Sequence, residues 1–131
     1  MSQQRRTDPF AELYGEFADR LRGDRWQPDV DVFETSGAVV VRVEIAGIRG
    51  DDVRVTVDGQ VLRLSGLRRA PEGDDLRRLY QMEIASGPFE RRVRIPVPFN
   101  RDRVSAHLAD GFLTVTLPRR NPARRKVKVE G

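Results

Sequence analysis

The 131-residue sequence contains no cysteine, which excludes disulfides, thiol catalysis and cysteine-ligated metals. It also contains no run of about 18 apolar residues, so we expect neither a transmembrane helix nor a membrane partner. The first ten residues, "MSQQRRTDPF", lack the apolar core of a secretion signal. A cytoplasmic protein with one domain of modest size is therefore expected.

Residues that could carry out catalysis are equally scarce. Histidine occurs once, as His107, and a single histidine cannot form a metal cluster. Neither of the glycine-rich phosphate-binding patterns G-x-G-x-x-G and G-x-x-x-x-G-K-[ST] occurs, so ATP use is not expected. The acidic pairs at 51–52 and 74–75 lie in turn-like sequence and are interpreted as turn residues. We predict that the protein is not an enzyme and takes no cofactor or metal.

Lysine is nearly absent. Only Lys126 and Lys128 occur, and arginine supplies the other 22 of the 24 basic residues. With 20 acidic residues the formal net charge is +4. Acids and bases alternate along most of the chain, which favours a solvated surface of ion pairs over a phosphate-binding face. The exception is 119–128, "RRNPARRKVK", which holds six basic residues and no acid. We expect no nucleic-acid partner, and a basic nucleic-acid-binding β-domain stays a less favoured alternative.

Residues 1–27 have the pattern of an N-terminal arm. Asp8 is a candidate N-cap, and Pro9 would take the first helical position. The following apolar residues recur at the spacing of an amphipathic helix. The arm either docks on its own domain or binds other proteins, and the residues expected to make this contact are Phe10, Leu13, Tyr14 and Phe17.

From residue 28 to residue 118 the apolar pattern changes to period 2, which is typical of half-buried β-strands. A long polar loop over 67–79 interrupts this pattern and leads into a weak strand at 80–84. We call the whole segment between the predicted strands 60–66 and 89–98 the excursion. Asp58-Gly59 indicates a two-residue hairpin turn. The pattern predicts an all-β, immunoglobulin-like antiparallel sandwich of seven to eight strands without helices between them, followed by an extended C-terminal tail over 119–131. The other predicted strands are 30–34, 38–46, 53–57, 60–66, 89–98, 104–108 and 112–117.

Three stretches of this domain resemble one protein family. The first begins "WQPDVDVFE" at Trp26 and runs to Gly66, with "AG" followed by Asp-Asp-Val. The second is "GPFERRVRIPVP", and the third is "AHLADGFLTVTLPR", which fits the pattern A-x-x-x-[DN]-G-x-L-x-[VI]-x-[LVI]-P. All three resemble the small heat-shock proteins, the Hsp20 family built on the α-crystallin domain, in particular its bacterial and plant-like members.

The resemblance implies an ATP-independent holdase chaperone that binds partly unfolded proteins and prevents their aggregation. It also implies a homodimer, in which a strand of the excursion crosses to the first strand of the neighbouring subunit and Arg91 supports the interface. A monomeric sandwich co-chaperone is the main alternative. The residues assigned to strand exchange are Leu79, Tyr80, Met82 and Ile84 on the crossing strand and Val30 and Val32 on its acceptor.

The family also implies a function for the end of the chain, where an [IV]-x-[IV] motif docks in a groove of another dimer. Val127 and Val129 fit this motif, and their alternation with charged residues suits a strand. Docking of this kind would build a larger homo-oligomer. The predicted acceptor groove consists of Val53, Val55, Val57, Val104, Ala106 and Leu108.

Overall fold

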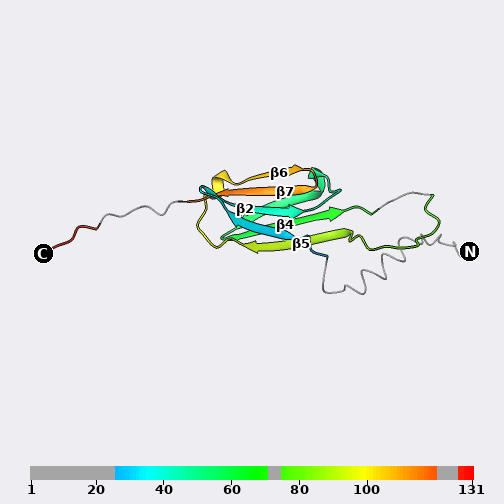
Figure 1. The fold of residues 1–131 in the computed structure, drawn as a ribbon, viewed down its shortest axis with the longest axis horizontal. Helices are drawn as coiled ribbons and strands as arrows, with labels where there is room; N and C mark the ends of the chain where they lie inside the picture. The colour runs from blue at the N-terminus through cyan, green and yellow to red at the C-terminus, as the bar shows by residue number, and fades with distance from the viewer. Residues whose placement is uncertain (1–25, 71–74, 121–126) are drawn as a thin grey trace, which may run out of the picture.

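The computed structural model describes residues 26–70, 75–120 and 127–131, and these form two antiparallel β-sheets (Figure 1). One sheet has the strand order β1-β2-β7-β6, and the other has the order β3-β4-β5. This arrangement confirms the predicted all-β sandwich. The strands are β1 Val30–Glu34, β2 Ala38–Glu44, β3 Val53–Asp58, β4 Val61–Arg68, β5 Gly87–Arg94, β6 Ser105–Ala109 and β7 Phe112–Pro118.

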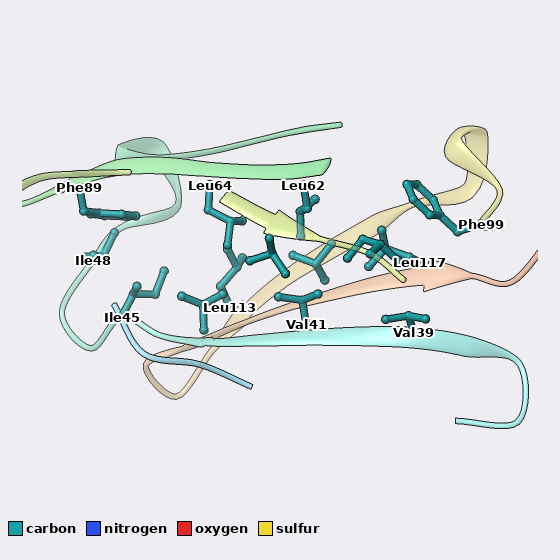
Figure 2. Packing of buried hydrophobic residues seen from close by; sticks show 14 residues of the cluster. Val39, Val41, Ile45, Ile48, Leu62, Leu64, Phe89, Phe99, Leu113 and Leu117 are labelled. Atoms are coloured by element: carbon teal, nitrogen blue, oxygen red, sulfur yellow. The ribbon is translucent and has the colours of Figure 1, made fainter. Parts of the chain in front are cut away.

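The core lies between the two sheets and follows directly from the period-2 pattern. Successive side chains of a strand point to opposite faces, so alternate apolar residues of each strand meet in the middle. Figure 2 shows Leu62 and Leu64 of one sheet pointing toward Val41 of the other. All three are fully buried. Burial of each such side chain contributes roughly 1.5–3 kcal/mol, which makes this cluster the main source of stability.

Two hairpin turns depend on backbone conformations with positive φ. Asp110 (φ 52°) and Gly111 (φ 80°) join β6 to β7, as expected for a type I′ turn, whose backbone twist matches that of the two strands. The turn between β3 and β4 is shifted by one residue from the prediction. Asp58 still pairs with Val61, so Gly59 and Gln60 form the turn.

Several local predictions differ from the structure. Two short 3₁₀ turns, Gly50–Asp52 and Arg101–Arg103, occur where no helix was predicted. The segment at 80–84 forms no strand in the single chain; the partner predicted for it is the first strand of a neighbouring subunit. Residues 127–131, whose predicted docking groove belongs to another dimer, likewise form no strand in the single chain. Among the described residues no helix is long and apolar enough to cross a membrane.

Candidate interaction surfaces

The contacts around the start of the sandwich establish which edges of the two sheets lie together. The Trp26 indole donates a hydrogen bond from Nε1 to the Gly87 carbonyl oxygen (2.9 Å), and its ring lies 5.1 Å from that of Phe89. Arg91 donates from Nη1 to the Pro28 carbonyl oxygen at 3.1 Å. The chain entering β1 is thus held against β5. The edges formed by β3 and β6 therefore lie together on the opposite side of the sandwich.

The seam between β3 and β6 is apolar and partly open to solvent. The side chains of the predicted groove that point inward are half-buried and pack against the core. Ala106 lies on the same face, opposite the buried Val115, but is itself exposed. The structure thus brings the six predicted groove residues to one seam between two sheet edges. Those packed on the core are Val53, Val55, Val57, Val104 and Leu108.

The end of the chain is exposed. Val127 is 74% exposed and Val129 is 91% exposed, and Figure 1 shows residues 127–131 away from the two sheets. The same chain therefore presents a half-buried apolar seam and an apolar motif that is not covered by its own sandwich.

The free edge at β1 and the excursion between β4 and β5 carry the other exposed large apolar residues of the described chain. On β1 these are Val32 (43% exposed) and Phe33 (47%). In the excursion they are Tyr80 (90%) and Ile84 (76%). Phe33 was missed by the sequence analysis because it lies on the alternate phase of β1, opposite Val40. The remaining residues predicted for strand exchange, Leu79, Met82 and Val30, are half-buried.

The two ends of the excursion meet at a cluster around Trp26. The Arg68 guanidinium lies 4.4 Å from the centre of the indole ring and donates from Nη1 to the Ala85 carbonyl oxygen at 3.0 Å. Phe89 packs on the indole ring, as described above. Trp26 lies within the range predicted for the N-terminal arm, whereas its contacts are with β4 and β5 of the sandwich. The cluster connects the last residues of the arm to both ends of the excursion.

A second contact holds the start of the excursion, where the chain leaves β4. Arg69 donates two hydrogen bonds to the Asp52 carboxylate, from Nε at 2.9 Å and from Nη2 at 3.0 Å. These hydrogen bonds hold the pKa of Asp52 below its ordinary value, with a smaller contribution from the positive charge itself. Asp52 directly precedes Val53. The contact therefore connects the excursion to the start of the apolar seam.

The structure does not place every candidate residue. Phe10, Leu13, Tyr14 and Phe17 lie outside the described residues. His107 is exposed on β6 and faces Thr114 on β7. No group of three or more potential metal ligands occurs among the residues that the structure describes.

Comparison with known proteins identifies what this arrangement resembles. The family model described as Hsp20/alpha crystallin family matches residues 31–130. The chain is 32% identical over 127 residues to the 17.8 kDa class I heat shock protein of Arabidopsis thaliana, covering 94% of this chain and 80% of that protein. It is 33% identical over 129 residues to spore protein SP21 of Stigmatella aurantiaca, covering 95% and 76%.

Solved structures agree with the sequence matches. Heat shock protein 16.0 of Schizosaccharomyces pombe superposes with a TM-score of 0.67 at 30% identity, covering 80% of this chain and 99% of that one. A small heat-shock protein of Xylella fastidiosa, described as having a distinct high order structure, superposes with a TM-score of 0.69 at 26% identity, covering 82% and 99%. The predicted resemblance is confirmed.

Proposed function

This chain belongs to the Hsp20/alpha crystallin family, and from that premise we propose that it is an ATP-independent holdase chaperone. It binds partly unfolded proteins and keeps them from aggregating. The observation that carries the proposal is the family match over residues 31–130, and membership of this family supports a chaperone role. The structure adds physical support, because three separate segments expose large apolar side chains, and their burial against another protein would be favourable.

The functional unit in this proposal is a homodimer formed by strand exchange. The segment from Leu79 to Ile84 crosses to a second copy and pairs with the free edge of β1 there. Pairing would satisfy the backbone hydrogen bonds of an open sheet edge and would bury apolar side chains that are exposed in one copy. Val32 and Tyr80 are examples, and Arg91 supports the interface by holding the chain just before β1.

Larger assemblies would form through the tail. Val127 and Val129 dock in the β3–β6 seam of a neighbouring dimer and complete its half-buried apolar surface. Dissociation of a tail exposes the seam again, so that the seam becomes a second apolar surface for clients besides the N-terminal arm.

Client binding is assigned to the arm, through Phe10, Leu13, Tyr14 and Phe17. The test is light scattering from a heated, aggregating enzyme with the protein added at up to equimolar amounts. Full-length protein should suppress the scattering without ATP. Deletion of residues 1–24 should weaken this protection while the sandwich stays folded, as shown by a cooperative thermal unfolding transition near the wild-type temperature.

A matched pair of variants separates the apolar stripe from the arm as a whole. The first variant replaces the four client-binding residues with serine, and the second replaces Glu12 and Glu16 of the same arm with serine. Only the first should lose protection. Absence of protection by the full-length chain would refute the holdase proposal, and full protection by the deletion variant would refute the assignment to the arm.

A further inference from the structure

The outer face of the β3-β4-β5 sheet is rich in arginine and has no part in the proposed chaperone contacts. Side chains that alternate with the buried core residues of these strands point to solvent. Among the outward residues of the three strands there are two carboxylates, Asp58 and Glu90. We call this surface the arginine face, and its basic residues are Arg54, Arg63, Arg92 and Arg94.

The strand register brings two of these arginines directly opposite each other. Arg63 of β4 is the cross-strand partner of Arg92 of β5. Like charges in this position destabilise a sheet, because their side chains lie about 5 Å apart. Glu90 offsets the repulsion by accepting from Arg63 Nε at 3.1 Å and from Arg92 Nε at 3.3 Å. Arg54 and Arg94 form no ion pair with any described residue.

The outer face of the other sheet has a different charge pattern. Its outward residues include one arginine, Arg42, together with the carboxylates of Asp31 and Glu44. The Arg42 guanidinium lies 3.9 Å from the centre of the Phe112 ring, so this cation already contacts an aromatic group. The two faces of the sandwich therefore carry opposite net charge, and the positive charge gathers on the arginine face.

We propose that the arginine face is a binding site for a linear chain of phosphate groups. Guanidinium groups bind phosphate through two parallel hydrogen bonds and are more weakly hydrated than an ammonium group, which suits a site built from arginine alone. Neighbouring strands are about 4.8 Å apart, and alternate residues of one strand are about 6.6 Å apart. A flexible phosphate chain can therefore contact Arg63, Arg92 and Arg94 in turn.

The same face lacks the aromatic side chains that single-stranded nucleic acid would use. None of its outward side chains is aromatic, whereas proteins that hold single-stranded nucleic acid stack the bases on aromatic rings. The ligand is thus recognised through phosphates and not through bases. Glu90 lies between two of the arginines, so it keeps them side by side but also competes with an incoming phosphate.

The experiment uses full-length protein and fluorescently labelled long-chain inorganic polyphosphate, with binding followed by fluorescence anisotropy. Binding should be saturable and should weaken steeply as sodium chloride is raised. Arg92→Gln/Arg94→Gln should weaken it roughly tenfold, equivalent to about 1.4 kcal/mol. Arg54→Gln alone should weaken it by a smaller factor and provides a second variant if the double variant does not fold.

Two controls make the result specific. Arg101→Gln/Arg103→Gln removes the same charge from two exposed arginines with the same spacing outside the arginine face and should leave the affinity unchanged. Glu90→Gln removes the competing carboxylate and should increase the affinity. Equal loss in both double variants would overturn the proposal in favour of attraction by net charge. Equally tight binding of a single-stranded oligonucleotide that responds to the same variants would overturn the assignment to a chain without bases.

Discussion

The proposed docking of the tail can be tested by shortening its two valines. In the described structure Val127 is 74% exposed and Val129 is 91% exposed, so nearly all of their apolar surface is available for burial in a groove. Each Val→Ala change removes two methyl groups, and burial of each contributes about 0.8 kcal/mol. Scaled by these exposed fractions, Val127→Ala/Val129→Ala should weaken one docked tail by at most about 2.6 kcal/mol.

This loss is large relative to the net affinity of a single tail. It corresponds to a factor of up to about 70 in the affinity of each tail, since about 1.4 kcal/mol is a factor of ten. Ordering each residue of the tail also costs about 1–2 kcal/mol, so a single tail binds weakly and an assembly needs several of them. The double variant should therefore shift larger oligomers toward dimers.

The assay is native mass spectrometry, with multi-angle light scattering at matched protein concentrations. Lys128→Ala is the matched control, because alternation directs this side chain away from the two valines. It should leave the oligomer distribution unchanged. A wild-type protein that is already a dimer, or a double variant with the wild-type distribution, would refute docking of Val127 and Val129 as the basis of assembly.

Three further predictions concern the sandwich itself. Gly66→Ala should destabilise it by about 1–3 kcal/mol in chemical unfolding, since the new Cβ would lie 2.4 Å from the Asp52 carbonyl oxygen and 2.6 Å from the Phe89 ring; an unchanged midpoint would contradict this packing. Trp26→Phe should lower the melting temperature and speed hydrogen exchange in residues 75–86, because the indole hydrogen bond and the arginine contact hold the excursion; equal exchange would exclude that coupling. The lowered pKa of Asp52 means that its bond to Arg69 stabilises the fold above its unfolded-state pKa and is lost as pH falls through the folded value. The stability advantage over Asp52→Asn should therefore shrink from about pH 6 to about pH 3, as measured by thermal melts, and a constant difference would refute this.

The strands could be predicted because their signal is local. Alternation of apolar and polar residues in 38–46 and 112–117 requires only that one face of each strand be buried, and the structure has β2 and β7 there. The positions of strand ends were less certain, because they depend on pairing. β5 ends at Arg94, just before the segment that contains Pro96 and Pro98, although its apolar pattern continues.

The interaction surfaces were predictable only in part. The half-buried positions on β3 and beside β6 followed from periodicity together with family resemblance. The role of Trp26 could not be predicted, since its partners Arg68 and Phe89 are more than 40 residues away along the chain. The excursion shows another limit, because the apolar pattern at 80–84 predicts a strand but does not specify which strand would pair with it, and none of the described strands does.

The sequence by itself determined the fold class, the family and the succession of strands along the chain. Each of these rests on side-chain alternation or on residues close together in the chain. Only the tertiary structure decided which sheet edges lie together, that Trp26 holds both ends of the excursion, and that four arginines share one face. These features depend on the register between strands and on contacts between distant segments. Neither the strand register nor these distant contacts can be deduced from the spacing of residues along the chain.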